Sequence, residues 1–119
     1  MPRRIVTVRG ESSTKKDARR LRLAALPGGL VHARIHNPPN TSGMECVLGR
    51  DDLDRLAASG PSSGTNVPAV DRSATAQLAV RPNGDAYLWI FTPGDEGWDI
   101  LVSQAQLARV LGELIRLEA

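Results

Sequence analysis

The sequence predicts an α+β fold in which a β-β-β-α unit occurs twice, forming antiparallel sheet backed by helices, with the copies related by a pseudo-twofold axis. The first observation is an internal similarity: LRLAALPGGLVHARIHNPP (21–39) aligns with AQLAVRPNGDAYLWIFTPG (76–94). The second is a Pro-x-Gly sequence at the same place in each copy, at 27–29 and 82–84, which favours a hairpin. Because a repeat of this length is typical of one supersecondary unit used more than once, we expect two copies in the chain.

The N-terminal residues 1–20 precede the repeats and are expected to form a basic arm, with room for an edge strand at 4–9, where apolar and polar residues alternate. Residues 1–22 carry eight Lys and Arg against two Asp and Glu, whereas the whole chain has a net charge of only +2. This asymmetry suggests a polyanion partner. A solubilising arm that binds nothing specific is the alternative, since a block of charge does not by itself identify a partner.

Four segments follow from this pattern, together in one compact domain. They are the basic arm, the first repeat, a linker rich in Gly, Pro and Ser, and the second repeat, at 1–20, 21–58, 59–74 and 75–119. Each repeat is expected to contain a hairpin, a third strand and a closing helix that buries its apolar stripe on the sheet. In the second repeat this helix begins at a capping box formed by Ser103 and Gln106.

The composition is that of an ordinary globular domain, with 41% hydrophobic and 24% charged residues. Because Cys46 is the single cysteine, no internal disulfide can form, and a reducing compartment is favoured. No apolar run approaches the roughly 20 residues of a membrane span, and the first residues lack the apolar core of a secretory signal. We therefore expect a cytoplasmic protein without membrane contact. The bias toward Ala, Arg, Leu and Gly suggests a GC-rich bacterial genome.

No combination of residues indicates an enzyme, so we expect no catalytic residue, metal ion or cofactor. His32 and His36 would lie about 13 Å apart on a strand, too far to share an ion. Cys46 lies in an apolar segment, which favours a buried structural thiol over a nucleophile. The acidic pair at 51–52 falls at a helix start, where capping explains it.

Three of the four aromatic side chains of the chain alternate with aliphatic residues in YLWIF at 87–91. On a strand, Tyr87, Trp89 and Phe91 occupy one face, and Leu88 and Ile90 occupy the other. We expect the aliphatic residues to be core and the rings to face outward onto a partner. The reverse arrangement, with the rings in the core, is the alternative. The equivalent positions of the first repeat hold His and Arg instead of rings.

A sheet face that carries rings and Arg is typical of proteins that hold single-stranded nucleic acid, because bases stack on rings and Arg meets phosphate. Trp and Tyr are also favoured at protein interfaces, so a second protein or a homodimer contact is an alternative. The residues expected to bind nucleic acid or a partner are Arg3, Arg4, Lys15, Lys16, Arg19, Arg20, Arg22, His32, Arg34, His36, Arg81, Tyr87, Trp89 and Phe91.

The order of strands and helices over 21–117 resembles the Whirly class and the related positive-cofactor class of single-stranded DNA-binding proteins. Those proteins use β-sheets backed by a helix, with two or more units assembled, and bind nucleic acid across the sheet. The expected unit has three strands where those families have four, and the resemblance carries no residue over.

The expected function is that of a small nucleic-acid-associated protein that binds single-stranded DNA or RNA, or of a transcription regulator. The alternative is a protein-interaction adaptor, an inhibitor or an immunity-like protein that uses the aromatic sheet face. A small enzyme or ligand-binding protein is a third and weaker hypothesis.

Overall fold

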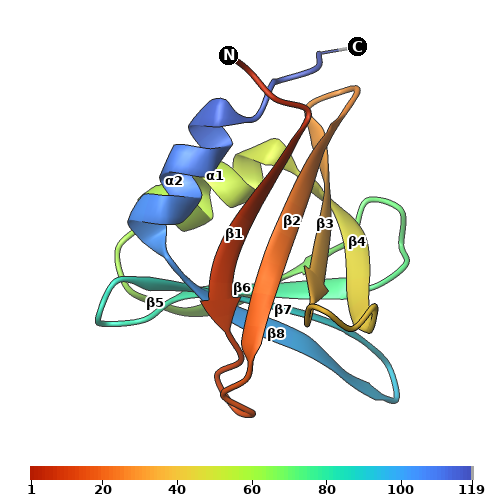
Figure 1. Ribbon diagram of the computed structural model, residues 1–119, viewed down its shortest axis with the longest axis vertical. Coiled ribbons are helices and arrows are strands. Elements are labelled where there is room, and N and C mark those ends of the chain that lie inside the picture. The colour runs from red at the N-terminus through yellow and green to blue at the C-terminus, as the bar shows by residue number, and fades with distance from the viewer. Residues whose placement is uncertain (119) are drawn as a thin grey trace.

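A computed structural model describes residues 1–118 of the chain (Figure 1). Within these residues it contains one antiparallel sheet of eight strands and two short helices. The strands are β1 (Ile5–Glu11), β2 (Ala18–Leu26), β3 (Leu30–His36), β4 (Gly43–Gly49), β5 (Ser62–Pro68), β6 (Thr75–Val80), β7 (Asp85–Thr92) and β8 (Asp95–Ser103), and the helices are α1 (Arg50–Ala58) and α2 (Gln104–Glu113).

The sheet has the strand order β4-β3-β2-β1-β8-β7-β6-β5, so the first and last strands of the chain meet at its centre. The β1–β8 junction is short, with Glu11 opposite Leu101 as its pair. Gly10 allows this approach, because a Cβ atom there would lie 2.1 Å from the carbonyl oxygen of Leu101. Figure 1 shows β1–β4 crossing β5–β8 at a steep angle, so that the sheet curls into a half-barrel with both helices on one side.

The core lies on the inner side of the curl. Strand alternation places one residue in two there, and the two helices cover the remaining opening with their apolar stripes. The buried positions on α1 include Leu53 and Leu56, and those on α2 include Leu107 and Leu111. The Ser103 hydroxyl accepts a hydrogen bond from the Gln106 amide and caps α2, as the capping-box sequence predicts.

Arg50, the first residue of α1, joins the two helices. Its guanidinium donates to the carbonyl oxygens of Leu111 and Leu114 at the end of α2, and also to the carboxylate of Asp54. These contacts satisfy carbonyls that the end of a helix leaves without partners, and they place a positive charge at the negative end of the helix dipole. The C-terminal end of α2 is therefore capped by a side chain from a distant part of the sequence.

The prediction of an α+β fold made of a duplicated β-β-β-α unit is wrong. The chain is mostly β, and its strands form one continuous curled sheet with two short helices. Two strands account for much of the difference. Residues 5–11 form the interior strand β1, in place of an arm or an edge strand, and residues 62–68 of the expected linker form the edge strand β5. Residue 119, the last of the expected second repeat, lies outside the described residues.

Composition explains why β5 was missed. Its sequence SSGTNVP has no apolar alternation, because most of an edge strand at this end of the sheet faces solvent. The expected hairpins are confirmed: β2 pairs with β3, and β6 pairs with β7. Gly29 and Gly84 in the two turns have φ values of 70° and 90°, a region that favours glycine.

Candidate nucleic-acid interface

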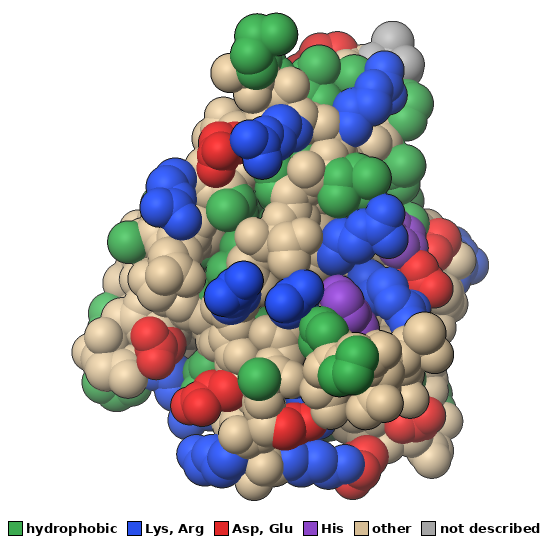
Figure 2. Space-filling view, viewed as in Figure 1, with side chains coloured by type: hydrophobic (Ala, Val, Ile, Leu, Met, Phe, Trp, Pro, Cys, Tyr) green, Lys and Arg blue, Asp and Glu red, His purple; other side chains and the backbone are tan. Residues whose placement is uncertain are grey.

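The outer side of β1, β2 and β3 carries a continuous basic surface. Antiparallel pairing places Arg9 opposite Arg20, Arg20 opposite His36, and Arg22 opposite Arg34. Because residues directly opposite each other lie about 5 Å apart, these side chains form a compact group. Figure 2 shows Lys, Arg and His side chains gathered over these strands. We call this surface the basic face; its members are Arg9, Arg20, Arg22, His32, Arg34 and His36.

Only part of this charge is compensated inside the molecule. Glu45 on the neighbouring strand β4 forms ion pairs with His32 and Arg34, and Arg34 also donates to the carbonyl oxygen of Thr41. Among residues 1–118, no carboxylate pairs with the other three arginines, Arg9, Arg20 and Arg22. These three guanidinium groups are free to bind an anion from solution.

The pKa of His36 is shifted by its partial burial and by the positive charge of the basic face. Its pKa lies below the ordinary value because partial burial disfavours the imidazolium, and because Arg34, Arg20 and Arg22 repel the added charge. An anion bound among these side chains would oppose that repulsion.

The outer side of β7 carries the predicted rings. Leu88 and Ile90 are buried, at 1% and 0% exposure, while Tyr87, Trp89 and Phe91 are partly exposed on the opposite side. The expectation that the aliphatic residues form the core is confirmed. The rings of Trp89 and Phe91 stack with centroids 4.0 Å apart. The Trp89 indole nitrogen Nε1 donates to the carbonyl oxygen of Glu96 over 2.7 Å. Together with the Arg81 guanidinium, which lies 5.2 Å from the centre of the Tyr87 ring, these residues form the ring-bearing face.

A hollow of 310 Å³ lies between the ring-bearing face and the loop that joins β1 to β2. We call it the ring hollow. It is lined by Thr14, Lys15, Arg19, Gln77, Tyr87, Trp89, Glu96, Gly97 and Asp99.

A buried polar cluster holds the β1–β2 loop against β8. The Asp99 carboxylate accepts hydrogen bonds from the Ser12 hydroxyl over 2.8 Å, from the backbone amide and hydroxyl of Ser13, and from the guanidinium of Arg19. Burial alone would raise the pKa of Asp99, but the hydrogen bonds from Ser13 and Ser12 and the charge of Arg19 outweigh it, so the pKa lies below its ordinary value. The wall of the ring hollow is therefore fixed by an ionised carboxylate.

The structure divides the predicted binding residues into separate groups. The basic face brings together Arg20, Arg22, His32, Arg34 and His36. The ring-bearing face holds the three rings, with Arg81 against Tyr87.

The other predicted residues lie elsewhere. Arg3 and Arg4 lie at the far end of β1, where the Arg3 amide donates to the carbonyl oxygen of Glu113 on α2. Lys15 and Lys16 lie in the β1–β2 loop, and Lys15 pairs with Glu96. Arg19 is buried at 4% exposure against Trp98, and it pairs with Asp99 in the wall of the ring hollow.

Sequence reasoning missed Arg9 and Gln77. Arg9 belongs to the basic face, and the alternation of Ile5, Thr7 and Arg9 with buried residues indicates that it lies on the exposed side of β1. Gln77 lines the ring hollow opposite Trp89 in the β6–β7 pairing. Period-two alternation with Leu78 and Val80 places Gln77 on the same face as the rings, so the sequence carried a signal for it as well.

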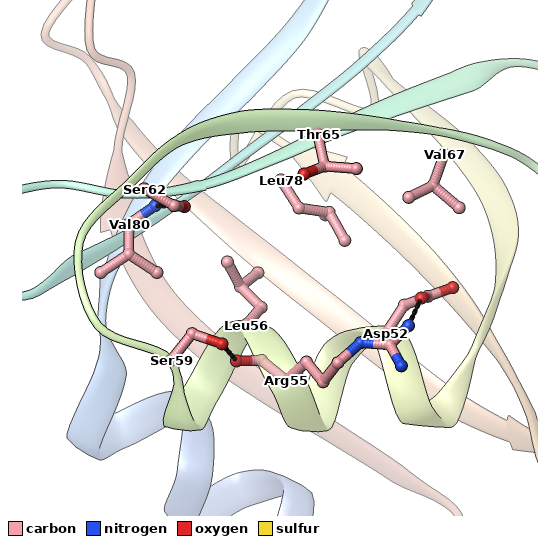
Figure 3. A pocket seen from close by; sticks show the side chains of 9 residues that line it. All are labelled: Asp52, Arg55, Leu56, Ser59, Ser62, Thr65, Val67, Leu78 and Val80. Carbon is pink, nitrogen blue, oxygen red and sulfur yellow. Dashed lines mark hydrogen bonds and ion pairs between the residues drawn. The ribbon is translucent and has the colours of Figure 1, made fainter.

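A second hollow, of 230 Å³, lies on the inner side between α1 and the β5–β6 hairpin (Figure 3). Its floor is aliphatic, with Leu56, Leu78 and Val80, and its rim holds an ion pair between Asp52 and Arg55. It contains none of the predicted binding residues.

Cys46 is buried, as expected, and burial followed by the charge of Asp71 raises the pKa of its thiol to about 12. Within residues 1–118 no group of three His, Cys, Asp or Glu side chains is placed to hold a metal ion. No helix in the described part of the chain is long and apolar enough to cross a membrane. Comparison of the chain with protein-family models, with curated proteins and with solved structures gives no match.

Proposed function

We propose that the protein binds single-stranded nucleic acid, DNA or RNA, with the phosphates of the strand lying along the basic face. The observation that carries this proposal is the group of three arginines, Arg9, Arg20 and Arg22, that lie side by side on neighbouring strands without an acidic partner among the described residues. Guanidinium groups bind phosphate oxygens through two parallel hydrogen bonds, and they are more weakly hydrated than ammonium groups. A polyanion is the ligand that uses several of them at once.

The ring-bearing face favours a single strand over a duplex. Bases of a single strand are free to stack on Tyr, Trp or Phe, whereas the bases of a duplex are stacked on one another. A regulatory role in transcription fits this chemistry, and we propose the cytoplasm as its location because the free thiol of Cys46 suits a reducing compartment.

Fluorescence anisotropy with a labelled single strand, measured over a range of salt concentrations, tests the proposal. For a single strand, the logarithm of the affinity should fall with the logarithm of salt by about 0.7 per phosphate contact. Arg9→Ala, Arg20→Ala and Arg22→Ala should each reduce this slope by about that amount. Arg55→Ala is the matched control, because it removes the same charge from α1, beside the inner hollow.

A slope near zero, or equal losses for Arg55→Ala and the three basic-face variants, would overturn the proposal. A protein partner on the ring-bearing face is the second candidate function. The partly exposed Trp89–Phe91 stack favours it, because aromatic side chains are enriched at protein interfaces. Such binding would depend weakly on salt and would be lost in Trp89→Leu.

A further inference from the structure

We propose that the ring hollow is a receptor for one unpaired base of the bound strand, separate from the basic face that binds its phosphates. This inference rests on the proposed function and adds a subsite to it. Four features of the hollow carry the argument: a rigid ring wall, an internally neutral lining, a small volume, and a wall residue, Arg19, shared with a hollow that contains Arg9 and Arg20.

The ring wall is fixed before any ligand arrives. Phe91 stacks on Trp89, and the Trp89 indole nitrogen donates to the carbonyl oxygen of Glu96. The ring therefore has little freedom to lose when a base stacks on it, and preorganisation of this kind favours binding. On the β8 side, hydrogen bonds from Ser12 and Ser13 to Asp99 hold the β1–β2 loop in place.

The charges that line the hollow cancel in pairs. Lys15 pairs with Glu96 over 3.2 Å, and Arg19 pairs with Asp99 over 3.3 Å. The hollow therefore differs from the basic face, because it offers no net charge to a phosphate. A flat, neutral, aromatic group fits this lining better than an ion does, and a nucleobase is such a group.

Gln77 supplies a polar group in the lining that is able to contact the edge of a base. Gln77 donates through Nε2 to the side-chain oxygen of Asn66 over 3.2 Å, which leaves its amide oxygen as an acceptor. Both oxygens of Asp99 already accept hydrogen bonds from the Ser12–Ser13 loop. The amide oxygen of Gln77 is therefore placed to accept a hydrogen bond from an amino or imino group of the base.

The size and position of the hollow select an unpaired base. At 310 Å³ it lies at the lower end of the range for ligand sites, which suits a single base. Arg19 lines the ring hollow on one side and, on the other, a neighbouring hollow of 200 Å³ that also contains Arg9 and Arg20. A strand whose phosphates contact these arginines can therefore place a base in the ring hollow.

The test compares two strands that differ by one base. The first is an abasic deoxyribose-phosphate strand, and the second is the same strand with a single central base; the wild-type protein is titrated with each at one salt concentration. Base stacking on an aromatic side chain predicts that the single base tightens binding by roughly 5- to 150-fold. The base-bearing strand should also quench tryptophan fluorescence, and the abasic strand should not.

Substitutions in the lining test whether the tighter binding of the base-bearing strand arises in the ring hollow. Trp89→Leu should abolish it, and Gln77→Ala should reduce it without a change in affinity for the abasic strand. Gln106→Ala, an exposed Gln→Ala change on α2, is the matched control. Gln77→Ala and the quenching measurement stand by themselves if Trp89→Leu does not fold.

The outcomes separate the two proposals. Equal affinity for the two strands, or a gain that survives both Trp89→Leu and Gln77→Ala, would overturn the receptor while leaving phosphate binding intact. Failure of both strands to bind would overturn the proposed function itself.

Discussion

The basic face and the ring-bearing face are two outer surfaces of one curled sheet, and they differ in how far their polar and charged groups are paired within the protein. Both lie opposite aliphatic side chains that alternate into the same core. On the basic face, some charges have no acidic partner among residues 1–118, as at Arg20 and Arg22. On the ring-bearing face and in its hollow, groups are paired with one another, as Lys15 is with Glu96 and Trp89 is with Phe91. Uncompensated charge gives affinity for any polyanion, whereas a neutral, fixed, aromatic wall discriminates between ligands.

The largest expected effect separates the two sides of β7. Leu88→Ala should lower the free energy of unfolding by about 2–5 kcal/mol, because it removes a fully buried side chain and leaves a cavity. Trp89→Leu keeps apolar volume on the outer side and should cost about 1 kcal/mol, comparable with the loss of one hydrogen bond. Urea denaturation of both variants measures the difference. Equal losses would show that the rings belong to the core.

A second effect distinguishes the two faces by their response to acid. The pKa of Asp99 is lower in the folded chain than its ordinary value of 3.8, so its contribution to stability is present above that value and is lost as the pH falls below it. Asp99→Asn should therefore lower the free energy of unfolding near neutral pH, and its stability should fall less steeply in acid than that of the wild type. Arg9→Ala, on the basic face, should leave the acid dependence unchanged, because the pKa of His36 is shifted by burial and by Arg34, Arg20 and Arg22. Urea titrations at several pH values between about 2 and 6 measure this. A parallel loss in Asp99→Asn and wild type would contradict the role of the carboxylate.

A third effect is confined to the basic face. Arg20→Ala should weaken binding to a single strand by about 1 kcal/mol at low salt while changing the unfolding free energy by less than about 0.5 kcal/mol. The reason is that its guanidinium has no partner among residues 1–118, so its removal disturbs no internal contact. Calorimetric melting and anisotropy, measured on one preparation, supply the two numbers. A large drop in the melting temperature would mean that the face is structural.

Period-two alternation explains how far the sequence could predict these faces. It correctly separates Leu88 and Ile90 from the rings, because it is a local property of a strand. The same rule, applied along β2, places Arg19 with Leu21 on the inner side, which agrees with the burial of Arg19. The burial of Arg50 at the end of α2 depends on a contact between distant segments, which no local pattern reports.

The order of strands in the sheet could not be predicted from local patterns either, because it too depends on contacts between distant segments. The junction of β1 with β8 brings together residues from the two ends of the chain, and the edge strand β5 has a composition typical of a linker. The ring hollow exists because this junction sets the β1–β2 loop beside β7. The side of β7 on which its rings lie could therefore be predicted from the sequence, but the position of the β1–β2 loop that completes the hollow could not.

The smallest expected effect uses His36 to sense whether the basic face is occupied. In the free protein, burial and the neighbouring arginines hold the pKa of His36 below its ordinary value of 6.5. Bound phosphates should raise it, so binding takes up a proton and the affinity increases modestly as the pH falls through this range. NMR titration of the imidazole, with and without a saturating single strand, measures the shift directly. His36→Gln should remove this part of the pH dependence while retaining the salt dependence that the three arginines supply. If the strand binds and the pKa of His36 does not change, the phosphates do not lie on the basic face. Other Lys and Arg side chains would then be the ones that bind them.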